Sequence, residues 1–217
     1  MPTQPKERPI LFSGDMIKAI LENRKSQTRR VIKPQPVISA PVVYNWHESR
    51  GVWRNYHDPG ARFRCPYGVP GDRLWVRETW KTASQYDDLP PSRLPCHAFE
   101  KGQDIVYAAD AEDSYSLSGR LRPSIHMPRW ASRITLEVMG VRVERVQEIS
   151  EEDAKAEGIN PIYDKDMYCD ERDLTHIHGT GGFIDLWDSI NAARGYPWAD
   201  NPWVWVVEFI AASKIGA

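Results

Sequence analysis

The 217-residue chain predicts a mixed α/β (α+β) fold, a small β-barrel with short flanking helices and long loop insertions. About six segments alternate polar and apolar residues or form short apolar runs, as strands do, and a few have helical spacing. The two kinds of segment do not alternate regularly, which disfavours a parallel sheet with crossover helices. A hydrophobic fraction of 41% is enough for a real core, so we expect one folded domain over 1–217.

The first predicted elements are a short strand over 9–12 and the helix that follows it. Ser13 is a suitable N-cap for this helix, and Asn23 is a suitable stop. The apolar stripe of the helix comprises Ile17, Ile20 and Leu21. Residues 25–32 then predict an extended segment that ends at Pro34.

The middle of the chain predicts strands separated by irregular segments. Residues 42–46 and 51–54 are spaced to pair as a hairpin, and 104–108 predict a further strand. The clearest strand covers 73–80, because it follows a Pro-Gly-Asp turn and alternates with period two. Glu78 ends the apolar face of that strand, where it is either a site carboxylate or the structural partner of an arginine.

The C-terminal part predicts long strands and one further helix. Residues 134–146 alternate on both sides of a Met-Gly pair, which indicates two strands or one bent strand. Apolar residues at helical spacing predict a helix over 183–191. The near-continuous apolar run at 203–210 predicts a central strand.

A compact helix is predicted over 150–158. Ser150 caps it, Asp153 stands at the reciprocal position of a capping box, and Gly158 terminates it. Glu157 lies at the C-terminal end, where the helix dipole disfavours a carboxylate. A residue that breaks a local rule invites a functional explanation, although surface helices often carry such residues.

Composition excludes several classes of protein. No apolar run is long enough to span a bilayer, and the N-terminus lacks the apolar segment of a signal peptide, so we expect a cytoplasmic protein with no membrane partner. The net charge of −2 disfavours a general nucleic-acid coat but is compatible with a local basic pocket. The odd number of widely spaced cysteines disfavours a disulfide framework. We expect no metal site, since no Cys-x-x-Cys pair accompanies the histidines, and no cofactor is required.

The run at 24–30, Arg-Lys-Ser-Gln-Thr-Arg-Arg, joins the first helix to the next strand. Lys25 is three residues before Thr28, so the amine of the lysine and the hydroxyl of the threonine can meet at one site. Neighbouring guanidinium groups can attract an anion to that site. The arginines of this run, which we take as candidate binding groups, are Arg24, Arg29 and Arg30. The alternative is a set of solvated charges that suit the C-terminal dipole of the helix.

Segment 122–133 is a second basic stretch. It interleaves cationic side chains with Trp130, as in surfaces that contact phosphates and stack bases. Its candidate binding residues are Arg122, His126, Arg129 and Trp130. The alternative is a loop whose tryptophan plugs the barrel and whose arginines pair with the acidic helix at 151–157.

Together these motifs resemble those of ASCH domains, which have a PUA-like β-barrel fold associated with RNA. The segments that carry the resemblance are 14–32, 70–79, 150–159 and 203–209. Segment 122–133 makes the chain especially similar to the longer phage and prophage members. Relative to the matched motifs the chain has insertions at about 35–60, 81–120 and 160–180. The second reads as an excursion over the core, and the sequence leaves open whether it acts as a lid.

One small bacterial branch of this family comprises amidohydrolases that remove the acetyl group from the exocyclic amine of acetylated cytidine. Its triad is similar to Lys25, Thr28 and Glu157 here. The resemblance implies Thr28 as the nucleophile, Lys25 as its base and Glu157 as the acid that protonates the leaving amine. Such chemistry needs a lysine of lowered pKa and a carboxyl of raised pKa. The chain is much longer than those compact enzymes and carries a second hydroxyl at Ser26, which leaves room for a different substrate.

Other readings stay open beside this metal-independent hydrolase. Members of the fold also bind RNA, and some are reported as ribonucleases, so the resemblance equally allows a non-catalytic RNA- or modified-base-binding protein, or a ribonuclease. A phage structural protein suits the nine tryptophans but not the focused cationic run. The sequence leaves open the modified base, the choice between nucleoside and polymer, and the oligomeric state.

Overall fold

The computed structural model describes residues 4–36, 46–49, 52–55, 62–95, 99, 104–110, 118–159 and 179–214. The strands are β1 (Glu7–Leu11), β2 (Gln27–Val31), β3 (Trp46–Ser49), β4 (Val52–Asn55), β5 (Arg62–Arg64), β6 (Arg73–Arg77), β7 (Trp80–Lys81), β8 (Val106–Tyr107), β9 (Ile134–Arg145) and β10 (Trp203–Lys214). The helices are α1 (Gly14–Leu21), α2 (Glu151–Ala156) and α3 (Gly179–Asn191), with short 3-10 turns between elements.

The main sheet is mixed and has five strands in the order β1-β6-β9-β10-β2. β1 and β6 pair in parallel, whereas β6–β9 and β10–β2 are antiparallel. β3, β4 and β5 form a second antiparallel sheet, and β7 pairs with β8. The mixed α/β class is therefore confirmed. Among the described strands no pairing closes the main sheet, so the barrel stays a prediction.

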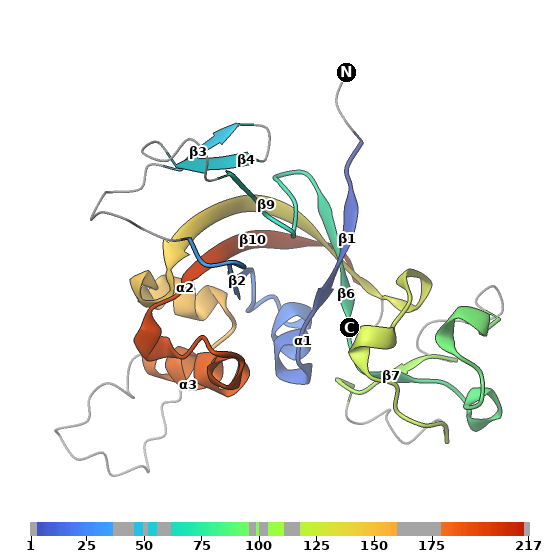
Figure 1. Ribbon diagram of the computed structural model, residues 1–217. Coiled ribbons are helices and arrows are strands. Elements are labelled where there is room, and N and C mark those ends of the chain that lie inside the picture. The colour runs from blue at the N-terminus through green and yellow to red at the C-terminus, as the bar shows by residue number, and fades with distance from the viewer. Residues whose placement is uncertain are drawn as a thin grey trace, which may run out of the picture. The chain divides into compact units, whose positions relative to one another are not determined.

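The chain divides into two compact units. Unit 1 comprises Met1–Asn23, Pro70–Val138 and Ile210–Ala217, and unit 2 comprises Arg24–Val69 and Met139–Phe209. The long strands β9 and β10, drawn as curved ribbons in Figure 1, run through both units.

Unit 1 has its apolar core on β6, α1 and the first half of β9. Ile17, Leu74 and Leu136 have no more than 1% of their surface exposed. A second cluster packs around β7 and β8, and its members are Trp80, Leu94, Ile105, Tyr107, Met127 and Ala131.

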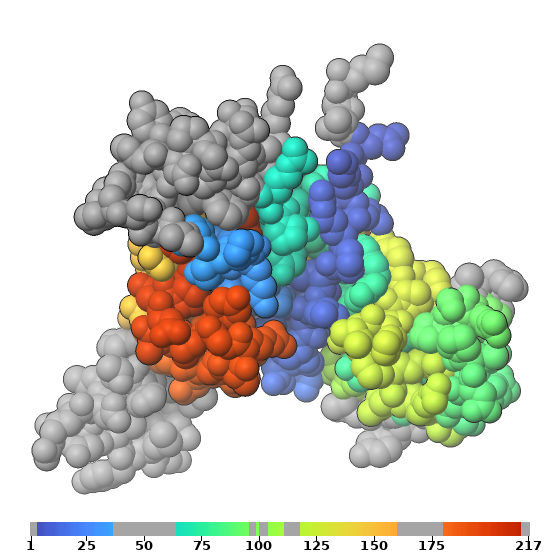
Figure 2. Space-filling view, viewed as in Figure 1, coloured from blue at the N-terminus to red at the C-terminus, as the bar shows by residue number. Residues whose placement is uncertain are grey.

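Unit 2 packs α2 and α3 against the face of β10 and β2 that carries the valines. Val206 of β10 is directly opposite Arg29 of β2 in the antiparallel register. The core of this unit consists of Val146, Ile149, Ala154, Phe183, Trp187, Val204 and Val206, with Val31 packed against it. Figure 2 shows residues 179–200 in orange beside the blue segment that contains β2, and Lys33 Nζ lies 5.1 Å from the centre of the Tyr196 ring.

Several predicted elements differ from the observed ones. The strand predicted over 73–80 is split into β6 and β7. β6 pairs in parallel with β1 in the main sheet, whereas Trp80 of β7 pairs with Tyr107 in another sheet. Of the two alternatives predicted for 134–146, the single strand is confirmed, as β9 runs from Ile134 to Arg145. Gly140 lies within this strand, and a Cβ there would lie 2.6 Å from Glu208 Oε2, the end of a flexible side chain. The expected hairpin falls at β3 and β4, and residues 42–45 lie outside the described part.

Candidate active site

Lys25 and Glu157, 132 residues apart in the chain, form a buried ion pair within unit 2. Lys25 Nζ donates to Glu157 Oε2 at 2.7 Å and to the Glu157 carbonyl oxygen at 2.8 Å. Their side chains are 0% and 3% exposed. The backbones of the two residues also form an isolated β-bridge, and Ser26 N donates to Ala156 O at 2.8 Å. The start of β2 is therefore fixed to the end of α2 by main chain and side chain together.

The end of α2 positions Glu157 as the sequence predicts. Ser150 accepts a hydrogen bond from the Asp153 amide at 3.1 Å and caps the helix. Glu157 is the C-cap residue, and Gly158 follows it with φ +86°, a conformation that favours glycine. The dipole at this helix end disfavours a carboxylate, so Glu157 depends on its cationic neighbours.

Arg29 approaches the same carboxylate from β2. Its Nη1 lies 3.5 Å from Glu157 Oε1, and its Nη2 donates to Asp153 Oδ2 at 2.6 Å and to Glu144 Oε2 at 3.1 Å. The Arg29 side chain is fully buried. A guanidinium group has the forked geometry that allows contact with several carboxylates at once.

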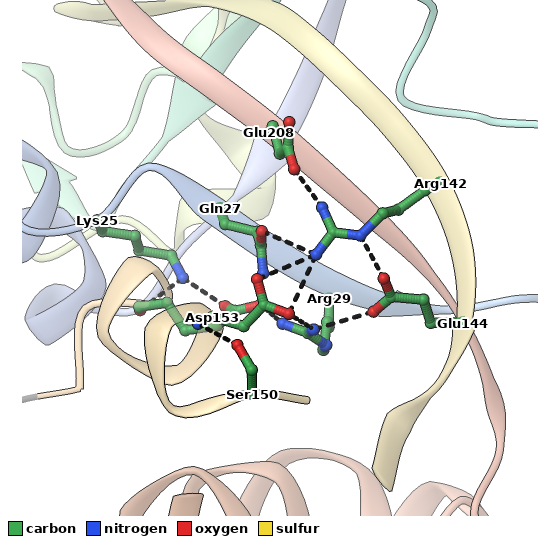
Figure 3. A network of polar contacts seen from close by, with 9 residues as sticks. Lys25, Gln27, Arg29, Arg142, Glu144, Ser150, Asp153 and Glu208 are labelled. Atoms are coloured by element: carbon green, nitrogen blue, oxygen red, sulfur yellow. Dashed lines mark hydrogen bonds and ion pairs between the residues drawn. The ribbon is translucent and has the colours of Figure 1, made fainter. Parts of the chain in front are cut away.

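Arg142 organises the outer part of this network (Figure 3). Its Nη2 donates to both Asp153 oxygens at 3.0 and 3.1 Å and to Gln27 Oε1 at 3.2 Å. It also pairs with Glu144 and with Glu208. Lysine and arginine groups thus alternate with carboxylates from the buried Lys25 outward to the half-exposed Glu208.

Thr28 and Arg30 lie on the other face of β2. Side chains alternate along a strand, and Gln27 and Arg29 both contact the network on the α2 side. Thr28 is 2% exposed and is opposite Val207 of β10. The charge of Arg30 nevertheless acts on both Lys25 and Glu157. The ion pair is therefore influenced by cations from both faces of β2, at the end of the strand where Thr28 lies.

Burial sets the electrostatics of this pair. It lowers the pKa of Lys25 below its ordinary value, and the charges of Arg30 and Arg29 act in the same direction. The Glu157 carboxylate opposes this shift by favouring the charged ammonium. Burial also lowers the pKa of Arg30. A lysine of lowered pKa is the kind of group that can accept a proton from a hydroxyl.

One oxygen of the Glu157 carboxylate can accept a further hydrogen bond. Within the described part of the chain, Glu157 Oε1 is buried and accepts no hydrogen bond, while Oε2 accepts from Lys25. Buried carboxylate oxygens are normally hydrogen-bonded, so an oxygen without such a bond calls for an explanation. It can accept a hydrogen bond from an amine, or carry a proton for one.

The remaining predicted residue of the basic run, Arg24, has a local structural contact. Its Nη1 donates to the Gly158 carbonyl oxygen at 3.1 Å. Arg24 thereby adds a bond from the segment before β2 to the turn after α2.

Glu78 lies in unit 1, where it pairs with an arginine. Its two oxygens accept from Arg133 Nε and Nη2, both at 3.0 Å, and Arg133 also donates to both oxygens of Asp110 at 2.6 and 2.8 Å. The Arg133 guanidinium lies 4.0 Å from the centre of the Tyr107 ring. Burial raises the pKa of Glu78 and outweighs the opposing hydrogen bonds from Arg133. Of the two roles predicted for Glu78, these contacts favour that of a structural partner.

Two of the predicted stacking and phosphate-binding residues of 122–133, Arg122 and Trp130, contact other residues of unit 1. Arg122 donates to the carbonyl oxygens of Tyr86 at 2.6 Å and Leu89 at 3.0 Å. Trp130 packs edge-on against Trp80, with ring centres 6.0 Å apart.

The other two residues of that group lie nearer the surface. Arg129 pairs with Glu7 at 2.8 Å in a half-exposed position, and His126 ends a short 3-10 turn. Arginines of this segment thus pair with Glu7, Glu78 and Asp110, and not with the acidic helix at 151–157 that the alternative interpretation names.

Sequence reasoning missed the partners that complete the network of unit 2. They are Arg142, Glu144 and Glu208, together with Asp153, which was assigned only to a cap. The charged residues Arg142 and Glu144 alternate with valines in β9, a signal that they share one face of the strand. Nothing in the sequence indicates that this face turns toward α2.

The described residues lack features of a metal site or a membrane span. They include no group of three or more His, Cys, Asp or Glu side chains suited to a metal ion. Cysteines and histidines that lie outside the described part include Cys96, His97, Cys169, His176 and His178. None of the described helices has the length and apolar character of a membrane span.

Comparison with known proteins adds little to this geometry. No family model and no curated protein matches the chain. A crystal structure of protein EF3133 from Enterococcus faecalis, of family DUF984, is similar over 100% of this chain and 86% of that chain, with 7% sequence identity. The TM-score of 0.40 is too low to support a conclusion about fold or function.

Proposed function

We propose that the protein is an ASCH-type hydrolase with a PUA-like fold, which cleaves the exocyclic amide of an acylated cytidine. The observation that supports this most directly is the buried pair of Lys25 Nζ and Glu157 Oε2 at 2.7 Å. The pair brings together the two groups that the ASCH resemblance assigns as base and acid.

The proposed chemistry uses the pair in its neutral form. Transfer of a proton from the Lys25 ammonium to the Glu157 carboxylate gives an amine that can accept a proton and a carboxylic acid that can donate one. The lowered pKa of Lys25 favours this form.

Thr28 is the proposed nucleophile. Its Oγ1 attacks the acyl carbon while its proton passes to Lys25, and the bond from that carbon to the exocyclic nitrogen breaks. Glu157 protonates the departing amine, and water then hydrolyses the threonine ester. The transfer of the Thr28 proton to Lys25 requires the Thr28 hydroxyl to reach Lys25 from the other face of β2.

A second candidate is a non-catalytic protein that binds a modified base. It is favoured by the placement of Thr28 on the face of β2 opposite to Gln27 and Arg29. In that case Glu157 Oε1 would accept a hydrogen bond from the exocyclic amine of the base without proton transfer.

The test is incubation of wild type, Thr28→Val and Thr28→Ser with a panel of acylated cytidines, read by mass spectrometry for loss of the acyl group. Valine keeps the shape of threonine without its hydroxyl, and serine keeps a hydroxyl as the matched control. We expect turnover by wild type and Thr28→Ser and a loss of about 10³-fold or more in Thr28→Val. Full activity of Thr28→Val would remove Thr28 from the mechanism. Binding without turnover by the wild type would favour the second candidate.

A further inference from the structure

The Glu157 carboxylate is held differently at its two oxygens. Lys25 donates to Oε2, while Oε1 accepts no hydrogen bond among the described residues and has Arg29 Nη1 at 3.5 Å. The orientation of the carboxylate therefore depends on two cations from β2 and the segment before it. If one cation moved, the group would be free to rotate.

Arg29 is itself fixed by two other carboxylates. Asp153 and Glu144 both accept from its Nη2, and Arg142 in turn binds Asp153 and Glu144. Asp153 comes from α2, the same helix that ends at Glu157, and Glu144 comes from β9. The guanidinium thus connects α2 at two points to β2.

We propose that Arg29 is the positioning residue of the candidate site. It fixes the Glu157 carboxylate against Lys25 and is itself held in place by Asp153 and Glu144. Arg29 takes no part in bond breaking and acts through Glu157. The kinetic consequence rests on the proposed hydrolase function, whereas the position of Glu157 does not.

The discriminating variant is Arg29→Lys, because it keeps the positive charge but replaces the forked donor with a single ammonium group. An ammonium cannot span Asp153, Glu144 and Glu157 in the same way, so Glu157 should move away from Lys25. The carboxylate raises the pKa of Lys25, so its departure lowers that pKa. A role of Arg29 as a charge alone predicts no change in this variant.

The first measurement is an NMR titration of ¹³C-labelled lysine side chains, with the Lys25 signal assigned from a Lys25→Arg variant. We expect the pKa of Lys25 to fall by about one pH unit in Arg29→Lys. Arg145→Gln is the matched control, because this β9 arginine donates to the Asn201 carbonyl oxygen and lies over Trp203. It should leave the Lys25 titration unchanged. An unchanged titration in Arg29→Lys would overturn the proposal.

The second measurement is the pH–rate profile with the acylated cytidine that the wild type hydrolyses. We expect Arg29→Lys to lower kcat by about 10- to 100-fold with little change in KM, and to move the acidic limb to lower pH along with Lys25. A wild-type kcat and profile would overturn the proposal. If the wild type hydrolyses none of the panel, the proposed function fails and the titration still decides the role of Arg29. If Arg29→Lys does not fold, Asp153→Asn replaces the carboxylate that Arg29 contacts at 2.6 Å with an uncharged amide and should give a smaller fall in the same direction.

Discussion

At the scale of single residues, two buried carboxylates differ in how many of their oxygens accept a hydrogen bond from a cation. Glu78 uses both oxygens on Arg133, whereas Glu157 leaves Oε1 without a hydrogen bond in the described structure. Fully satisfied buried pairs specify a local packing, and incompletely satisfied ones are candidates for function. The hydrogen bonding therefore indicates a structural role for Glu78 and a functional one for Glu157, a distinction that the sequence alone leaves open.

Glu78 leads to a prediction about stability and pH. Burial raises its pKa above the ordinary value of 4.5, so the folded state binds its proton more tightly than the unfolded state. Its contribution to the free energy of unfolding therefore decreases as pH rises from about 4.5 through the pKa of the folded state. Glu78→Gln is uncharged at every pH and lacks this decrease. We expect the variant to gain stability relative to wild type as pH rises, measured by urea denaturation in steps from pH 4 to pH 8.

Glu7→Gln is the control with the opposite sign. The hydrogen bond from Arg129 lowers the pKa of Glu7, so its stabilising contribution is present above pH 4.5 and is lost as pH falls through its folded pKa. This variant should lose stability relative to wild type as pH rises. The same trend in both variants would show that the predicted proton linkage of Glu78 is wrong.

The partners of these residues could not be predicted from the sequence. One of the two interpretations of segment 122–133 pairs its arginines with the helix at 151–157. Arg133 instead pairs with Glu78 and Asp110, and that helix pairs with Arg29 and Arg142. Opposite charges attract without regard to chain position, so which of them meet depends on strand register. In contrast, Glu157 attracts notice locally because it breaks a helix rule, and its role as an acid comes from the resemblance to ASCH domains.

At the scale of elements, the caps predicted for two helices behave differently. Ser150 accepts a hydrogen bond from the Asp153 amide, whereas Ser13 stands at the N-cap of α1 without a side-chain capping bond. Both serines have the right position, and only one uses its hydroxyl there. The N-cap positions of α1 and α2 could be predicted because they depend on neighbouring residues, whereas α3 begins at Gly179, before the predicted range. The break between β6 and β7 was missed because it depends on strands distant in sequence.

The difference between the caps predicts a difference in stability. Ser150→Ala should lower the free energy of unfolding by about 1 kcal/mol, because it leaves an amide of α2 without its acceptor. Ser150→Asp restores an acceptor and should recover most of the loss. Ser13→Ala should change stability by less than about 0.5 kcal/mol. Equal losses in the two alanine variants, measured by urea denaturation, would contradict the assignment of the cap at α2.

At the scale of the whole molecule, several cationic side chains of the described residues pair with carboxylates of the chain itself. The net charge is −2. Cationic residues that pair with the chain's own carboxylates include Arg8, Lys25, Arg29, Arg129, Arg133 and Arg142. Arg122 donates to backbone carbonyl oxygens. Side chains engaged in this way are poorly placed to neutralise the phosphates of a polymer.

This internal pairing predicts weak and nearly salt-independent binding to RNA. Each phosphate contact contributes about −0.7 to the slope of log affinity against log salt for a single strand. A protein that makes one or two such contacts loses less than about tenfold in affinity between 50 and 200 mM salt, whereas six to ten contacts cost from about 300-fold to about 10⁴-fold. We expect the smaller change, measured by fluorescence anisotropy with a labelled single-stranded RNA of mixed sequence. The matched comparison is binding of an uncharged acylated cytidine to Thr28→Val, which should not vary with salt. A steep loss for the RNA would favour a polymer ligand over a free nucleoside, because only a polymer offers the protein many phosphates at once.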